Sequence, residues 1–321
     1  MAAYGQDPVG TIADGAKIVF LAVFVVVAIR AFLSRNLPRV GGKIGQRRNI
    51  EPAEPIPAGF SAVYERAVTV AAPASDAAPP ADLKAFLRHG VTQRQTLMRV
   101  YRVRGCKTEI EIPMAAPDYA RIDAAEALAL LRELPDPRLI RRLHLSDERC
   151  FLDPWVHKLR GQQFFTLGHA TNFRLVVLYK PDRRLCEIVG LTLLHEWLHI
   201  VAFGSSLAVW RFSRANAIEP LVPAAIAPAF NPGRKSAIYE AWSDLGEKLF
   251  GYDETVAREA ALTSPAHAMI IWRRVDMIMR KAPARLRSTR FAEWDRRAAF
   301  MTAEVAPRAK AVRRRSGVGF E

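Results

Sequence analysis

An α+β fold is predicted for the main part of this chain of 321 residues, and three observations support it. Helical stretches recur along its second half, and a β-rich run, NFRLVVLYK, occupies residues 172–180. The composition, with 50% hydrophobic and 25% charged residues, excludes a wholly disordered protein and suffices for one sizeable core. Three cysteines without a CxxC pair exclude a disulfide scaffold and a thiolate zinc finger.

The order of the elements follows from hydrophobic periodicity and from helix-capping and turn signals. Helices are predicted at residues 82–89, 123–134, 138–144, 186–203, 236–250, 265–281 and 290–305. One strand is predicted at 172–180, and a second, short strand at 62–70. Four prolines within 204–235 exclude a membrane helix there and predict a loop.

The N-terminal segment contains twelve consecutive apolar residues, 18–29, followed by Arg30 and a further apolar triplet. If Arg30 extends towards the interface, residues 16–37 reach the roughly 20 residues that span a bilayer. Acidic residues precede the run and no small-residue cleavage site follows it, which argues against a secretory signal peptide. We therefore expect residues 1–40 to hold an N-terminal tail and a single-pass membrane anchor. The excess of Lys and Arg after the run predicts a cytosolic C-terminal part.

Composition divides the rest of the chain into three segments. Residues 41–81 are rich in Pro, Ala and Gly and are expected to form a tether, residues 82–305 a globular domain, and residues 306–321 a basic tail. The net charge of +15 suits nucleic acid, anionic lipid or an acidic protein face. No nucleic-acid-binding motif accompanies this charge, so no specific nucleic-acid partner is expected.

The chemistry-bearing motif lies in residues 188–203, IVGLTLLHEWLHIVAF, where Thr192, His195, Glu196 and His199 form a narrow polar stripe. Buried imidazoles and carboxylates are costly unless they have partners. The four-residue spacing of an HExxH motif places both rings on one helix face, where they can share a zinc ion. Glu196 then lies beside the open coordination position as a general base. The alternative is a pair of core histidines bonded to backbone or to a carboxylate.

Two glutamates compete for the third ligand position. Glu219 lies twenty residues after His199, but between prolines, where no helix fixes its direction. Glu240 lies on the amphipathic helix predicted at 236–250, with Asp244 one turn later to hold a ligating imidazole by its second ring nitrogen. We therefore favour Glu240 as the ligand. An ordinary exposed acidic face remains the alternative for this pair of carboxylates.

HEWLH followed by YEAWSD resembles the gluzincin class of zinc metallopeptidases, over about residues 172–251. The resemblance implies a zincin-like domain in which an edge strand before the HExxH helix binds extended peptide, and 172–180 occupies that place in the order. It further implies the following roles: His195, His199 and Glu240 as zinc ligands, Glu196 as the general base and Asp244 as the residue that braces a ligand. The interval from His199 to Glu240 is longer than in thermolysin-like enzymes. The oxyanion-stabilising residue does not transfer, and the candidates for it are Tyr239, Tyr252 and His267.

The function expected from these features is that of a membrane-tethered zinc metalloendopeptidase acting on peptide or protein substrates in extended segments. The alternative is a structural or scaffolding membrane protein with a basic surface, in which the HExxH site is structural or inactive. An open coordination position distinguishes the two, because a structural zinc site is closed by a fourth protein ligand. An intramembrane protease is disfavoured, because sixteen residues, 188–203, are short for a span.

Overall fold

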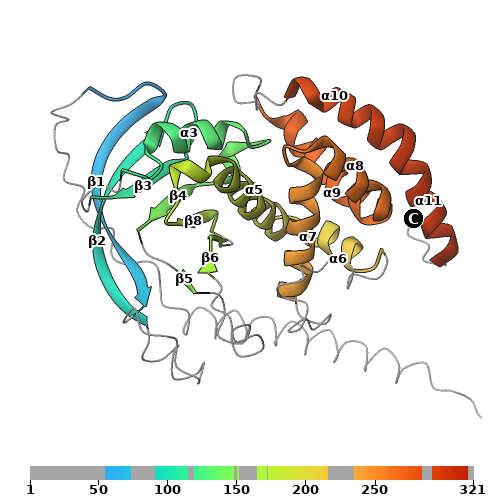
Figure 1. Ribbon diagram of the computed structural model, residues 1–321, viewed down its shortest axis with the longest axis horizontal. Coiled ribbons are helices and arrows are strands. Elements are labelled where there is room, and N and C mark those ends of the chain that lie inside the picture. Colours follow the sequence, from blue (N-terminus) through green and yellow to red (C-terminus); the bar gives the residue numbers. More distant parts are fainter. Residues whose placement is uncertain are drawn as a thin grey trace, which may run out of the picture. The chain divides into compact units, whose positions relative to one another are not determined.

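The computed structural model describes residues 55–73, 91–114, 119–147, 150–151, 165–171, 173–215, 235–283 and 291–316. They belong to one compact unit, Gln46–Glu321, and the other unit, Met1–Gly45, lies outside the described residues. The predicted anchor and its topology, the helix predicted at 82–89 and Glu219 therefore also lie outside them. The α+β class is confirmed by a mixed six-stranded sheet together with helices (Figure 1).

The sheet has the strand order β1-β2-β3-β4-β8-β7. Its strands are β1 (Phe60–Pro73), β2 (Val91–Val103), β3 (Glu109–Pro113), β4 (Arg142–Ser146), β7 (Gly168–Ala170) and β8 (Leu175–Tyr179). The pairs β3–β4 and β4–β8 are parallel, and the other pairs are antiparallel. A separate two-stranded sheet pairs β5 (Cys150–Phe151) with β6 (Phe165–Thr166).

The strand predicted at 172–180 is present as β8, but its predicted place at a free edge is wrong. β8 lies inside the sheet, between β4 and β7, and the edge strand is β7. Val176, Val177 and Leu178 are all buried, as is typical of a strand covered on both faces. Such a continuous apolar run indicates an interior strand, so the same residues that predicted the strand argue against an exposed edge.

Two further predictions need correction. The predicted helix at 138–144 is wrong, because Asp136 caps only the 3-10 turn η1 (Pro137–Leu139), and β4 follows. Leu143 and Leu145 face the core in alternation with polar residues, which is the period of a strand. The tether predicted at 41–81 contains β1, which pairs with β2 along its length, so the folded body begins before Asp82.

The helices largely follow the predicted order. They are α3 (Ala124–Arg132), α5 (Cys186–Phe203), α6 (Ser206–Ser213), α7 (Lys235–Phe250), α8 (Glu254–Thr263), α9 (Pro265–Lys281), α10 (Phe291–Phe300) and α11 (Ala306–Ser316). The π-helical turn η6 (Met301–Val305) joins α10 to α11. The sequence did not predict α6, in the proline-containing loop, or α8, and the predicted basic tail contains α11.

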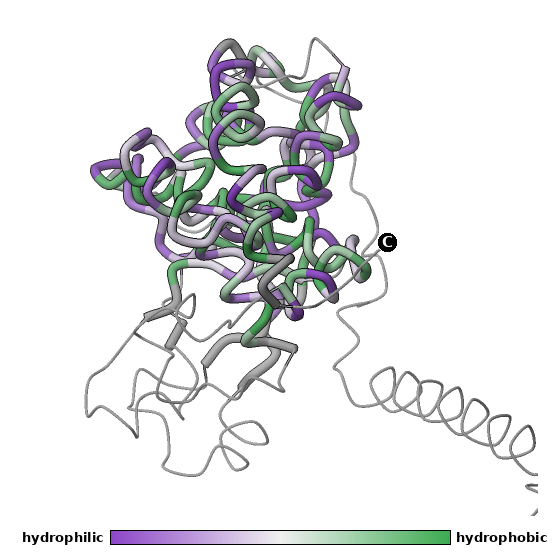
Figure 2. The backbone as a smooth tube through the Cα atoms, turned by 90° about the vertical axis from the view of Figure 1, so that its right-hand side faces the viewer, coloured by the Kyte–Doolittle hydropathy of each residue, from purple (hydrophilic) through white to green (hydrophobic). Residues whose placement is uncertain are grey.

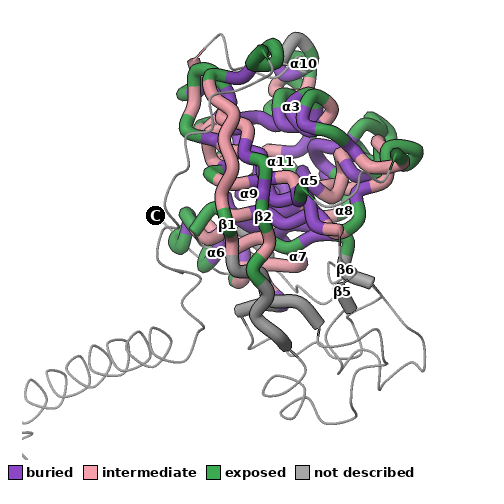
Figure 3. The backbone as a smooth tube through the Cα atoms, turned by 90° about the vertical axis from the view of Figure 1, so that its left-hand side faces the viewer, coloured by how far each residue is buried: buried purple, intermediate pink, exposed green. Residues whose placement is uncertain are grey.

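The core lies between one face of the sheet and the helices, and α5 runs through its centre. This helix contacts α3, the strands β7 and β8, and α7 (Figure 1). Trp197 is fully buried and its indole nitrogen donates to the Asp136 carbonyl at 2.9 Å. Buried segments lie in the middle of the folded body (Figure 3), and hydrophobic stretches run through most helices (Figure 2). Isolation of α5 from water therefore requires both the sheet and the other helices.

Among the described residues, Arg183–Phe203 is the one helical stretch with the length and composition to cross a membrane. A buried core helix passes the same test, and 56% of the most apolar window is buried inside the protein. In this structure α5 packs between the sheet and α7. The finding is therefore weak evidence for a membrane span.

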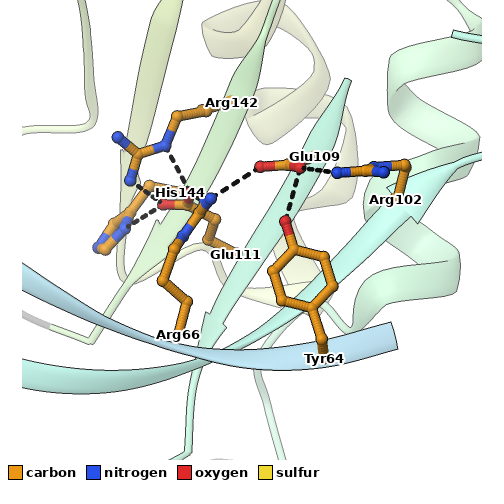
Figure 4. Close-up of polar contacts among 7 residues, drawn as sticks. All are labelled: Tyr64, Arg66, Arg102, Glu109, Glu111, Arg142 and His144. Atoms are coloured by element: carbon orange, nitrogen blue, oxygen red, sulfur yellow. Dashed lines mark hydrogen bonds and ion pairs between the residues drawn. The ribbon is translucent and has the colours of Figure 1, made fainter. Parts of the chain in front are cut away.

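The opposite face of the sheet is polar and is held by an ion-pair network (Figure 4). Glu109 and Glu111 alternate on β3 with Ile110, which lies in the core. The fully buried Glu111 accepts hydrogen bonds from Arg66 and from Arg142 Nη2 (2.8 Å), and its carboxylate lies 3.4 Å from His144 Nδ1. Burial raises the pKa of Glu111, but these hydrogen bonds and the arginine charges outweigh burial and lower the pKa to about 2.

Replacing Glu111 by Gln should lower the free energy of unfolding by about 3 kcal/mol at neutral pH, because it removes a buried carboxylate that pairs with two partly exposed arginines, of which, among the described residues, only Arg66 keeps another carboxylate partner, Glu109. Because the pKa of Glu111 is lower in the folded than in the unfolded state, ionised Glu111 stabilises the fold fully above pH 4.5, the unfolded-state pKa. This stabilisation is lost as the pH falls from 4.5 towards about 2. The difference between wild type and Glu111→Gln in urea unfolding should therefore shrink over that window. The matched control is Glu65→Gln on β1. A difference that stays constant from pH 7 to pH 2 would contradict the assigned pKa.

Candidate metal centre

The histidines of the predicted HExxH motif lie on the buried part of α5. His195 and His199 are one turn apart, with their ring centroids separated by 4.9 Å, and both rings lie towards α7. Thr192, the fourth member of the predicted polar stripe, donates its hydroxyl to the Ile188 carbonyl at 2.9 Å. The hydroxyl of Thr192 is therefore satisfied within the helix, and the polar side chains that need partners are the two histidines and Glu196.

Helix α7 supplies those partners because it packs closely on α5. Gly246 of α7 lies against Leu198 of α5, where an added β-carbon would approach Leu198 Cδ1 to 2.7 Å. Since a side chain at this position would clash, glycine allows the two helix backbones to come close. The close approach brings Glu240 and Glu247 of α7 within reach of the histidines on α5.

Three of the predicted residues form a group that could hold a metal ion. His195, His199 and Glu240 each offer one ligand atom, and these atoms all lie within 4.8 Å of one another. Glu240 Oε2 lies 3.4 Å from His195 Nε2, and Glu240 Oε1 lies 3.4 Å from His199 Nε2. Two ligands of a tetrahedral zinc ion, each about 2.0–2.2 Å from the metal, are roughly 3.3–3.6 Å apart. The two separations from Glu240 therefore lie in the range found between ligands of one zinc ion.

The charges around the group also favour a cation. Three carboxylates, those of Glu196, Glu240 and Glu247, surround His195 and His199. Burial lowers the pKa of His195, but hydrogen bonds to Glu240 and Glu247 and the charge of Glu196 raise it to about 10. Burial opposes ionisation of Glu240 as well, yet the two histidines hold its pKa well below the usual range. Without a metal, protonated His195 pairs with these carboxylates, and a divalent cation between neutral imidazoles would supply the same positive charge.

Glu196, the predicted general base, lies beside the group and is buried, with 6% of its surface exposed. Burial, with the charges of Glu240 and Glu247, raises the pKa of Glu196 to about 7, although the neighbouring histidines act in the opposite direction. A carboxylate with a pKa near 7 can accept and return a proton at neutral pH.

The edge strand β7 runs past Glu196, which the sequence did not reveal. A β-carbon on Gly168 would lie 3.2 Å from Glu196 Oε1 and 3.0 Å from Thr192 Cγ2, so glycine keeps this approach open. The next residue, His169, lies with its Nδ1 3.0 Å from the Tyr179 hydroxyl. Burial lowers the pKa of His169, and the charges of His144 and His199 lower it further, so the strand lies within electrostatic reach of the centre.

The carboxylate that contacts the second ring nitrogen of His195 is Glu247, and the contact predicted for Asp244 is not found. Glu247 Oε2 lies 2.9 Å from His195 Nδ1, whereas Asp244 pairs with Lys248 at 2.7 Å. Positions seven apart on a helix differ in direction by about 20°, and positions four apart by about 40°, so Glu247 aligns better with Glu240. The E-x₆-E spacing was the sequence signal that could have identified Glu247.

The three candidates for oxyanion stabilisation have different surroundings. The Tyr252 hydroxyl donates to Glu133 at 2.7 Å. His267 is 2% exposed and packs against Phe212, and burial lowers its pKa to about 4. Tyr239 precedes Glu240 on α7 and packs its ring against Phe203. Of the three, Tyr239 is the one adjacent to a residue of the metal-binding group.

Comparison with known proteins does not assign the chain to a family. No protein-family model, curated protein or solved structure matches it. The argument about function therefore depends on the geometry of the site.

Glu247→Gln should weaken zinc affinity by about 10–100-fold, because it removes the charge that orients His195 through its second ring nitrogen. Asp244→Asn, on the same helix, should leave the affinity within about twofold of wild type, because Asp244 pairs with a surface lysine. Competition with a chelator of known affinity measures both values. The assignment of Glu247 would be wrong if Asp244→Asn were the more damaging substitution.

Proposed function

We propose that this protein is a zinc-dependent metalloendopeptidase of the gluzincin type, with His195, His199 and Glu240 as the zinc ligands. The observation that supports this most strongly is the combination of three ligand atoms within 4.8 Å of one another and a buried carboxylate, Glu196, beside them. A structural metal site needs no such carboxylate. A zincin-like fold for the sheet and helix α5 is part of the same proposal.

Glu196 and Glu247 would each have a separate role in peptide hydrolysis. Zinc, when bound, supplies Lewis acidity and lowers the pKa of a coordinated water to about 7. Glu196 would accept a proton from the attacking water and pass it to the leaving amine, since it lies buried beside the three ligand residues. Glu247 would hold the His195 ring in orientation by accepting from Nδ1–H.

The substrate would be an extended peptide laid along β7, the edge strand of the sheet. β7 pairs with β8 on one side and ends the strand order on the other. An edge strand binds extended peptide by main-chain hydrogen bonds. Gly168 favours this arrangement, because its missing side chain brings the strand backbone close to Glu196. In this proposal β7 takes the part that the sequence assigned to residues 172–180.

We further propose that residues 18–33 tether the enzyme to a membrane with the catalytic part in the cytosol. This proposal is supported by the apolar run and the basic residues that follow it. Substrates would then be cytosolic segments near the membrane surface.

Glu196→Gln should bind one zinc per chain, as wild type does, and lose hydrolysis of a broad peptide library by roughly 100-fold or more, because it removes the base and retains the ligands. Glu187→Gln, on the exposed first turn of the same helix, is the matched control and should keep full activity. If the wild-type protein and both variants bind one zinc per chain but none of them cleaves any peptide, the site is a structural zinc site. Wild-type cleavage rates in Glu196→Gln would refute the proposed mechanism.

A further inference from the structure

One end of the sheet collects positive charge far beyond what its carboxylates balance. The strands β1, β3, β4 and β8 begin at this end, and β2 and β7 finish there. Three connections therefore meet at it: the β2–β3 turn, the segment before β4 and the β7–β8 turn. We name this surface the basic end and define it by Arg102, Arg104, Lys107, Arg141, Arg142, Phe173 and Arg174.

The cations of the basic end are only partly neutralised. Arg102 pairs with Glu109 at 3.0 Å, and Arg142 pairs with Glu111. Lys107, Arg141 and Arg174 are exposed and form no ion pair with any residue that the structure describes. The backbones of Arg141 and Arg174 are held together, because the amides of Arg141 and Arg142 both donate to the Arg174 carbonyl, at 2.8 and 3.2 Å. The surface thus carries positive charge that no described carboxylate neutralises, and the backbones that carry Arg141 and Arg174 are hydrogen-bonded to each other.

An open hollow of about 510 Å³ lies in this surface. It is lined by Arg102, Cys106, Lys107, Glu109, Arg141, Arg142 and Phe173, so that four cations face a single carboxylate. At its border Phe173 is 81% exposed, although a phenylalanine is normally buried. The following residue, Arg174, has a φ of +62°, which is rare for a residue with a side chain. The turn therefore holds a large apolar ring out towards solvent among cations.

We propose that the basic end docks on an anionic bilayer, with the cations on lipid phosphates and Phe173 inserted at the headgroup level. Basic residues around an exposed aromatic are the pattern of membrane-surface binding. The hollow would take one phosphate-bearing headgroup between Lys107 and Arg141. The six cations are presented from three connections at one end of the sheet rather than from a single loop.

The course of the chain favours a bilayer over nucleic acid as the partner. Residues 55–59 lead into β1 at this same end, where the Arg104 amide donates to the Gly59 carbonyl at 2.8 Å. If residues 18–33 form the predicted anchor, 26 residues, 34–59, separate it from β1, so the anchor would lie near this end along the sequence. Docking would then present the rest of the folded body in one orientation.

The test is hydrogen exchange on the full-length chain in nanodiscs of pure phosphatidylcholine or of an equal mixture with phosphatidylserine. Peptides covering residues 104–108 and 171–174 should exchange at least about fivefold more slowly on the anionic discs, because one cation near such a surface contributes roughly that factor. High salt should abolish the difference. The triple variant Lys107→Gln, Arg141→Gln, Arg174→Gln should exchange equally on both discs.

The matched control removes the same charge from helices α9 and α11, as Arg273→Gln, Arg308→Gln and Lys310→Gln, and should keep the wild-type protection. Equal exchange of the wild-type peptides on neutral and anionic discs would overturn the proposal. Two further arms use inorganic phosphate and a single-stranded RNA oligonucleotide with the chain on neutral discs. Protection by either of them, without protection by phosphatidylserine, would also overturn the proposal and identify the basic end as a site for that ligand.

Discussion

The close packing of α5 against α7 is the constraint on which the candidate centre depends. The two histidines on α5 do not form the possible metal-binding group alone, because its third member, Glu240, lies on a separate helix, α7. The contact of Gly246 with Leu198 lets the two helices approach until Glu240 lies 3.4 Å from each imidazole. Glycine weakens the interior of a helix, and at this position the loss is offset by the approach that it permits.

The sheet has a different role on each of its faces. On one face it buries α5 and sets β7 beside Glu196, which raises the pKa of that carboxylate by excluding water. On the other face, buried Glu111 holds Arg66 and Arg142 together with His144, and this network fixes β1, β3 and β4 relative to one another. The helix that carries the two histidines and Glu196 thus packs on one face of a sheet whose other face is joined by ion pairs.

Much of the site could be predicted from the sequence because its signals are local. HExxH spacing and helical periodicity are properties of a single helix, and they correctly located α5 and the pair of histidines. Glu240 was favoured over Glu219 because a helix fixes direction, and Glu240 does lie beside the histidines. The choice of Asp244 instead of Glu247 was wrong because the relevant direction depends on how α7 crosses α5, which local spacing does not specify.

The sheet was harder to predict because strand order depends on pairing between distant segments. The apolar run in β8 identified a strand, yet its place between β4 and β7 depends on partners far along the chain. β7 has only three residues, Gly168–Ala170, and so short a strand leaves no periodic pattern to detect. The short strand predicted at 62–70 is present within β1, but the Pro, Ala and Gly around it indicated a tether, and β2, with which β1 pairs along its length, was not predicted.

The central claim is that α5 and α7 together hold a catalytic zinc ion with one position open. X-ray absorption at the zinc edge of the purified full-length protein tests it most directly. The claim predicts two imidazoles at about 2.0–2.1 Å, one carboxylate oxygen, and one further oxygen that does not come from the protein. A sulfur ligand, or a fourth side-chain ligand that closes the site, would contradict the claim.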